Sequence, residues 1–256
     1  MKYILVLLVI IGIANAQELI LNQSNQVNEQ RQAEQRRLST SRDYDDYINT
    51  MKKAISLGDY SAGIYLGALF SQDINLKDGV KKANLTLAKK YFRFSFNKGY
   101  GLAAFYLSKL ENPNQAILDI KKALYMKYTT KKIRELLAIR YAEIILNDDE
   151  LYKNKRAVKM AIADIEPISA NSDNPLLDFQ LAHLFYVDNQ LQKANKYINS
   201  ACNNKKATLQ LLALCLNDPY LATRGKDGKE IVKKTLPRLS DEMYNNSNIG
   251  IKNRSK

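Results

Sequence analysis

Apolar residues recur along most of the chain at the spacing of amphipathic helices. One quartet, at offsets 0, +4, +5 and +8, lies on one side of a helix. Its copies start at positions 62, 103, 137, 177 and 207, and the copy at 103 is weaker because it ends in Glu111. A second quartet, at offsets 0, +3, +4 and +7, falls between them, with its best copies at 88 and 194 and poorer ones at 116, 157 and 232. The pattern predicts two kinds of helix in alternation.

The spacing of the first quartet indicates a repeat. Its starts are 41, 34, 40 and 30 residues apart, and periods of this size are typical of helical-repeat proteins. One helix pair cannot bury its apolar face alone, whereas about five stacked pairs can. We therefore predict an all-α repeat domain over residues 43–240. An ordinary helical bundle is the alternative, because Leu- and Ala-rich helices generate such quartets readily.

Residues that start or end helices interrupt this pattern. Asn112–Pro113 and Asn174–Pro175 each place a capping side chain before a proline at the first helical position. Gly58 and Gly99 stand where a helix would end. Pro167 is expected to end the helix that contains residues 157–165. No segment alternates convincingly with a period of two, so no strand is predicted.

The N-terminus has the features of a secretory signal. Lys2 precedes an apolar run from Tyr3 to Ala14, and residues 14–16 form an A-x-A cleavage site. The run is shorter than the roughly 20 apolar residues of a membrane-spanning helix, although an uncleaved anchor is the alternative. We expect a signal peptide over residues 1–16, a periplasmic or secreted protein, and no transmembrane segment in the mature chain. Residues 17–42 are expected to form a polar Gln-rich spacer, and residues 241–256 a basic, disordered tail.

The net charge of +13 comes mainly from lysine, with 28 Lys and 11 Arg among the 39 basic residues. Arginine is the usual residue for bidentate recognition of phosphates and bases, so we expect no nucleic-acid partner. The lysines form either a solvated surface or a surface that attracts an acidic partner, such as an anionic component of the cell envelope. We favour the solvated surface, because the lysines are scattered.

The segment Ala54–Leu110 resembles the Sel1-like repeat, a relative of the tetratricopeptide repeat. It runs AISLGDYSAGIYLGALF and continues, from Ala88, as AKKYFRFSFNKGYGLAAFYLS, with Ala, Leu-Gly and aromatic residues in the family's order. Residues 192–212 look like a second, more degenerate copy, and the family's Gly-rich loop is reduced to residues 73–80. The resemblance implies a right-handed solenoid of about five antiparallel helix pairs. It also implies a scaffold or adaptor, with no shared enzymatic residues and no cofactor.

These features predict an exported protein–protein interaction scaffold or adaptor of the bacterial envelope. An accessory subunit of an envelope secretion or conjugation machine is an alternative. A β-lactam- or cell-wall-directed hydrolase is a weaker one, because the chain lacks a nucleophile motif such as S-x-x-K. We therefore expect no enzyme.

The two cysteines, Cys202 and Cys215, invite a disulfide in an oxidising compartment. Geometry argues against it, because Cys215 lies about 12 Å along a helix that starts near Ala207, whereas a disulfide needs Cα atoms within about 7 Å. Cys215 also takes the quartet position of Phe70 and Phe185, which favours a buried thiol. The lone histidine, His183, has no companion ligands at metal-site spacing, so we expect no metal and no catalytic site.

The resemblance to tetratricopeptide arrays implies a concave groove that binds a protein or peptide. Groove residues stand two before, two after and five after the core residue of the first helix in each pair. Aligning Leu66, Leu107, Tyr141, Leu181 and Leu211 as these core residues gives nine candidates: Ile64, Phe105, Lys109, Ile139, Glu143, Phe179, His183, Tyr186 and Leu209. Phe105, Phe179 and Tyr186 are the strongest, because aromatic residues dominate binding hot spots. The alternative is that these side chains pack against the neighbouring repeat.

Signal cleavage is expected to leave Gln17 as the first residue of the exported protein. Mass spectrometry of N-terminal peptides from the cell envelope or medium measures this end directly. Recovery of an exported peptide that still contains residues 3–14 would instead establish an uncleaved anchor.

Overall fold

The computed structural model describes residues 38–218. The expectations for residues 1–37 and 219–256, among them the signal peptide and the basic tail, lie outside the described residues. Within residues 38–218 the protein is mostly helical, with eleven helices and one short hairpin, so the all-α prediction is confirmed at that level. No helix in this range has both the length and the apolar character needed to span a bilayer.

Within the described residues the chain divides into two compact units, with the boundary between Tyr141 and Ala142. The elements of the first unit are α3 (Ser41–Ser56), α4 (Ala62–Phe70), β1 (Ile74–Leu76), β2 (Gly79–Lys81), α5 (Leu85–Asn97), α6 (Leu102–Leu107) and α7 (Pro113–Ala123). α8 (Lys131–Asn147) crosses the boundary. The second unit continues with α9 (Asp149–Lys153), α10 (Lys155–Ala170), α11 (Pro175–Val187), α12 (Leu191–Asn203) and α13 (Leu209–Asn217).

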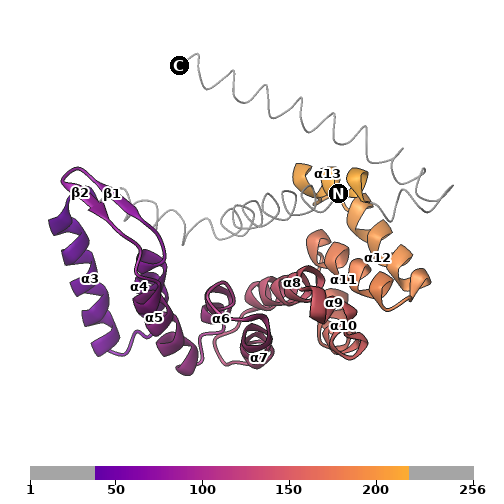
Figure 1. Ribbon diagram of the computed structural model, residues 1–256, viewed down its shortest axis with the longest axis horizontal. Helices are drawn as coiled ribbons and strands as arrows, with labels where there is room; N and C mark the ends of the chain where they lie inside the picture. The colour runs from indigo at the N-terminus through magenta and orange to yellow at the C-terminus, as the bar shows by residue number, and fades with distance from the viewer. Residues whose placement is uncertain (1–37, 219–256) are drawn as a thin grey trace, which may run out of the picture. The chain divides into compact units, whose positions relative to one another are not determined.

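Within each unit, consecutive helices pack on one another. In the first unit α3 packs on α4, α4 on α5, α5 on α6 and α6 on α7. In the second unit α10 packs on α11, α11 on α12 and α12 on α13. Figure 1 shows both series, from indigo to magenta in the first unit and from red to orange in the second. Each helix therefore finds its apolar contacts close by in the sequence.

Alternate helices bury different amounts of their surface. α4 buries seven of its nine residues and α11 buries seven of its thirteen. α5 and α12, by contrast, each bury four of thirteen residues along one stripe. The first quartet thus marks helices that are covered on several sides, and the second marks helices with one covered face.

The predicted helix boundaries are confirmed at four places. The Asn112 and Asn174 side chains accept hydrogen bonds from the backbone N–H groups of Gln115 and Leu176, each with a proline at the start of the helix. Gly58 and Gly99 follow α3 and α5 with φ of 96° and 92°. These values lie in the left-handed region that glycine adopts without steric cost.

α3 begins at Ser41, before the predicted domain start at residue 43. The Thr40 hydroxyl accepts from the Asp43 N–H at 3.2 Å, and the Asp43 carboxylate accepts from the Thr40 N–H at 2.9 Å. These two bonds form a capping box, which satisfies two backbone donors that the helix leaves unpaired. Hydrogen bonds lower the pKa of Asp43 below its ordinary value, and the bond with the Ser39 hydroxyl contributes most, before the bond with Thr40. The spacer expected over residues 17–42 therefore overlaps the first helix.

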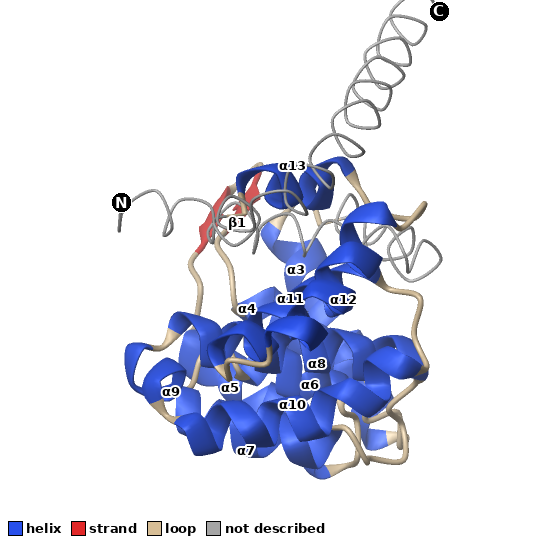
Figure 2. Cartoon of the chain, turned by 90° about the vertical axis from the view of Figure 1, so that its right-hand side faces the viewer, coloured by secondary structure: helices blue, strands red, loops and turns tan. Residues whose placement is uncertain are grey.

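A short β-hairpin corrects the prediction that the chain has no strand. β1 and β2 pair antiparallel, with Leu76 opposite Gly79, and Figure 2 shows them as the red strands. The Asp73 carboxylate closes the base, accepting from Lys82 Nζ at 2.7 Å and from the Ala83 N–H at 2.9 Å. The Asp78 carboxylate accepts from the Ser41 N–H at 2.8 Å, which ties the turn to the start of α3. Strands of three residues are too short to produce a period-two signal.

The prediction that Pro167 ends its helix is wrong. Pro167 lies inside α10, which continues to Ala170. The proline ring stands on the exposed side, whereas Ile165 and Ser169 on the opposite side are buried. The backbone hydrogen bond that proline cannot donate is therefore lost where water can replace it, and the buried contacts keep the last turn helical.

Glycine allows α4 and α5 to approach closely. A Cβ atom at Gly67 would lie 2.5 Å from Cδ1 of Phe92. Phe92 is buried and stacks on Tyr106 of α6, with ring centroids 4.9 Å apart. A Cβ atom at Gly63 would meet the Ser95 hydroxyl in the same way. The helix pair thus depends on two positions without a side chain.

Gly67→Ala is expected to lower the free energy of unfolding by about 1–2 kcal/mol. Overpacking costs about 1–3 kcal/mol, and a 2.5 Å contact with the buried Phe92 ring places this substitution at about 2–3 kcal/mol. The better helix propensity of alanine offsets about 1 kcal/mol of that. Urea denaturation followed by circular dichroism measures the change. Phe92→Leu should cost less in the Gly67→Ala background than in the wild type, because it removes the clash. An unchanged or higher unfolding free energy for Gly67→Ala would contradict the close approach.

Candidate functional site

The first-unit groove candidates are mostly buried. Ile64, Phe105 and Ile139 are covered, and the Phe105 side chain is only 8% exposed. Lys109 is partly exposed, and its ammonium lies 4.4 Å from the centroid of the Phe105 ring. This burial favours the alternative in which Phe105 packs against neighbouring helices rather than against a partner.

The second-unit groove candidates are more accessible. Phe179 is 7% exposed and belongs to an apolar cluster that includes both cysteines. Glu143, His183, Tyr186 and Leu209 are partly exposed. The burial of Phe179 favours a packing role for it too, so the accessible candidates of the two units are Lys109 and these four residues.

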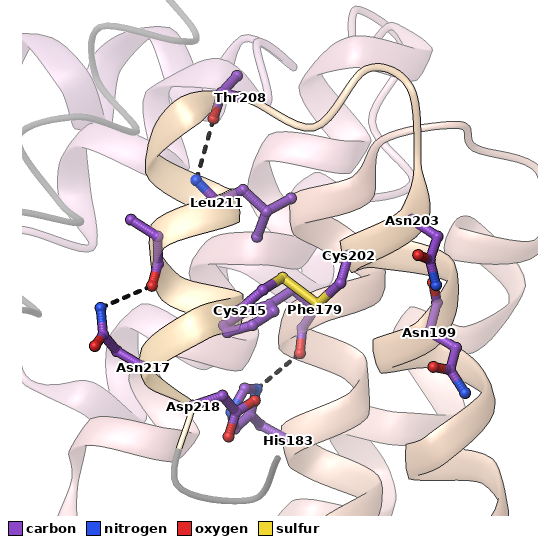
Figure 3. The surroundings of a disulfide bond; sticks show 11 residues. Phe179, His183, Asn199, Cys202, Asn203, Thr208, Leu211, Cys215, Asn217 and Asp218 are labelled. Carbon is purple, nitrogen blue, oxygen red and sulfur yellow. Dashed lines mark hydrogen bonds and ion pairs between the residues drawn. A yellow bond between two sulfur atoms is a disulfide. The ribbon is translucent and has the colours of Figure 1, made fainter. Parts of the chain in front are cut away.

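His183 is held between a backbone carbonyl and a buried carboxylate. Its Nδ1 lies 2.8 Å from the carbonyl oxygen of Phe179, and its Nε2 lies 3.4 Å from Asp218 Oδ2 (Figure 3). The ring also packs on Phe179, with centroids 4.5 Å apart. Contacts on both ring nitrogens fix the orientation of the imidazole. No group of three or more potential ligands for a metal occurs within residues 38–218.

The expectation that Cys202 and Cys215 stay unbridged is wrong, because they form a disulfide. Their Cα atoms are 5.9 Å apart and their sulfur atoms 2.11 Å apart. Figure 3 shows the reason: the connection rises from the end of α12 to Thr208, and α13 then descends past Cys202. The rise of the connection offsets the length of α13 between its start and Cys215, so Cys215 lies beside Cys202. The quartet position of Cys215 was still informative, since both cysteines are fully buried.

A charged cluster in the first unit escaped the sequence analysis. Arg93 Nη2 lies 2.5 Å from Glu111 Oε1 and 2.7 Å from Asp119 Oδ2, and both carboxylates are almost fully buried. Lys89 Nζ adds a contact of 3.2 Å to Glu111. The hydrogen bond to Asp119 is the main cause that raises the pKa of Arg93. Glu111 breaks its apolar quartet because it joins this cluster, and that break was the available signal.

Comparisons with known proteins identified no relative: no family model matches the chain, and no curated protein and no solved structure is significantly similar to it. The resemblance to Sel1-like repeats therefore stays a prediction from the residues that carry it.

Replacing both cysteines with alanine is expected to lower the free energy of unfolding by about 3 kcal/mol. The bond closes a loop with a sequence separation of 13, and a loop of that size restricts the unfolded chain by roughly this amount. Urea denaturation of the oxidised wild type and of Cys202→Ala/Cys215→Ala measures the difference. A reductant should destabilise the wild type and leave the double variant unchanged. Equal stability of all forms would contradict the bridge.

Proposed function

We propose that this protein is an exported scaffold or adaptor for protein–protein interactions in the bacterial envelope. We further propose that its helices form a right-handed solenoid of about five antiparallel pairs of the Sel1-like or tetratricopeptide-like type. The observation that carries the proposal is the alternation of helices covered on several sides, such as α4 and α11, with helices covered on one face, such as α5 and α12. Stacked repeats need this division, because each pair is covered by its neighbours.

The disulfide supports the export part of the proposal. Disulfides persist in oxidising compartments and are rare in the reducing cytosol. Cys202 and Cys215 are the only cysteines of the sequence, and both lie in the bridge. This observation is independent of the apolar run and cleavage site at the N-terminus, and it favours the same periplasmic or secreted location.

The partner in this proposal is a protein or peptide held on the accessible groove positions. Tyr186 is the best of them, since tyrosine supplies a large contact area at low entropic cost and this side chain is partly exposed. Grooves between stacked helices bind helices or extended peptides.

Capture of a partner from the native envelope tests the proposal. A photo-reactive amino acid at position 186 of the tagged protein is expected to cross-link a specific envelope protein. Tyr186→Ala is expected to weaken co-purification of that protein by about tenfold, a loss of about 1.4 kcal/mol, with little change in melting temperature.

Tyr152→Ala is the matched control, because Tyr152 is an exposed tyrosine outside the groove register. A specific partner whose recovery is equally insensitive to both variants would contradict the groove. Retention of the protein in the cytoplasm with reduced cysteines would contradict the export proposal.

A further inference from the structure

Tyrosines and lysines from three connections of the first unit form a surface that includes none of the proposed groove residues. It consists of Tyr60, Lys98, Tyr100, Lys127 and Tyr128, and we call it the Tyr–Lys surface. These residues come from three connections: between α3 and α4, between α5 and α6, and between α7 and α8. The connections are joined directly, since the Tyr128 N–H donates to the Gly99 carbonyl at 3.3 Å.

The rings of this surface are held in place by contacts with other aromatic rings. Tyr100 stacks on Tyr128, with ring centroids 4.6 Å apart and an interplanar angle of 22°. Tyr60 meets the ring of Phe94 edge-on at 5.8 Å. Tyr128 nevertheless remains 44% exposed. Fixed, exposed aromatic side chains lose little entropy when a partner covers them.

Both lysines are positioned by cation–π contacts. The Lys98 ammonium lies 4.6 Å from the centroid of Tyr60, and the Lys127 ammonium lies 5.0 Å from that of Tyr128. Such a contact restrains the flexible stem and leaves the N–H donors on the outer side available. Lys98 and Lys127 are both exposed, so two positive charges stand at defined places, one beside the half-buried ring of Tyr60 and one beside the exposed ring of Tyr128.

The surrounding sequence has more lysines than acidic residues. Between positions 98 and 132 there are two acidic residues, Glu111 and Asp119, and seven lysines, at 98, 109, 121, 122, 127, 131 and 132. Both acidic side chains are almost fully buried and paired with Arg93. The acidic neighbour on the other side is Asp59, whose carboxylate already accepts hydrogen bonds from the Ser61 N–H at 3.1 Å and hydroxyl at 2.5 Å. Lysines therefore outnumber the acidic residues around this surface, and this excess of positive charge favours an acidic partner.

The geometry of the rings favours a peptide over a polysaccharide. A sugar ring stacks on the open face of an aromatic side chain. Tyr100 stacks on one face of the Tyr128 ring, and the Lys127 ammonium lies 5.0 Å from the centroid of the same ring, so Tyr128 offers less open face to a sugar than an isolated tyrosine would. Burial and the neighbouring Tyr128 raise the pKa of Tyr100 above its ordinary value, so its hydroxyl stays protonated and can donate to a carboxylate.

We propose that the Tyr–Lys surface binds an extended acidic segment of a partner protein, whose carboxylates pair with Lys98 and Lys127 while its backbone and small side chains lie along Tyr100 and Tyr128. This inference rests on the proposed scaffold function and names a second contact surface for the partner, together with its chemistry. Charged pairs at such a surface set specificity and the association rate, and the rings supply the contact area.

Fluorescence anisotropy on the purified full chain tests this directly. The probe is a labelled peptide in which Glu alternates with Ser, measured at physiological ionic strength. Lys98→Glu/Lys127→Glu is expected to weaken binding by at least about tenfold. The matched control Lys52→Glu/Lys90→Glu changes two exposed lysines of the same unit by the same total charge and should weaken binding by less than about threefold. Tyr128→Ala should weaken binding, whereas Tyr152→Ala should not.

Four results would overturn the inference. The first is that the wild type does not bind the peptide, and the second is that the two lysine variants lose equal affinity. The third is that a folded Tyr128→Ala variant binds the peptide as tightly as the wild type does. The fourth is that polygalacturonate binds at Lys98 and Lys127 more tightly than the peptide. Because Tyr128 also packs on Tyr100, melting curves accompany each variant, and the lysine pair keeps every ring in place if Tyr128→Ala unfolds. All these measurements use purified protein, so their failure leaves the export and Tyr186 capture results untouched.

Discussion

The close approach of neighbouring helices is the contact on which the rest of the structure depends. Gly67 of α4 meets the ring of Phe92 of α5, and Gly63 meets the hydroxyl of Ser95. That hydroxyl donates to the carbonyl of Tyr60 at 2.7 Å, so the small polar group at the contact is itself satisfied. In the second unit, small alanine side chains allow the same close approach. Ala182 of α11 is buried, and so are Ala194 and Ala201 of α12. Larger residues at these places would separate the helices and expose the apolar stripes that hold them.

Charge is arranged differently inside the first unit and on its surface. Arg93 gathers two buried carboxylates, one before α7 and one within it, and so ties α5 to α7 across α6. Removing the guanidinium or the carboxylates would leave an uncompensated buried charge, and that is far more costly than losing a surface pair. Lys98 and Lys127, by contrast, are exposed, and they lie beside the rings of Tyr60 and Tyr128. The same stretch of chain thus uses its acidic side chains to hold the fold together and its lysines to form the surface.

The sequence was most informative where local chemistry decides the structure. Asn112 and Asn174 cap helices because their side chains reach N–H groups a few residues away, and such short-range rules can be read from spacing alone. The positions of the buried quartets follow equally from helical geometry.

Pro167 was misread because the outcome depends on which side of α10 is covered, and that is set by other helices. The hairpin at residues 74–81 was missed because carboxylates at its base and turn hold strands that are too short to show a pattern. Of the nine groove candidates, four are buried and five are partly exposed; the buried ones are Ile64, Phe105, Ile139 and Phe179. Burial at these positions depends on how neighbouring helices cover them, and helical spacing along the sequence does not determine that.

The bridge between α12 and α13 has a consequence for how the protein matures. With two cysteines in the whole chain, only one intramolecular pairing exists, so oxidation cannot produce a scrambled isomer and needs no shuffling enzyme to correct it. Because the bond spans one helical hairpin, a newly made chain can close it as soon as that hairpin collapses, before any distant segment is in place. Once closed, the bond keeps the two helices of the hairpin together when the surrounding contacts open transiently. It therefore protects this hairpin from proteases, which cleave segments that have unfolded locally.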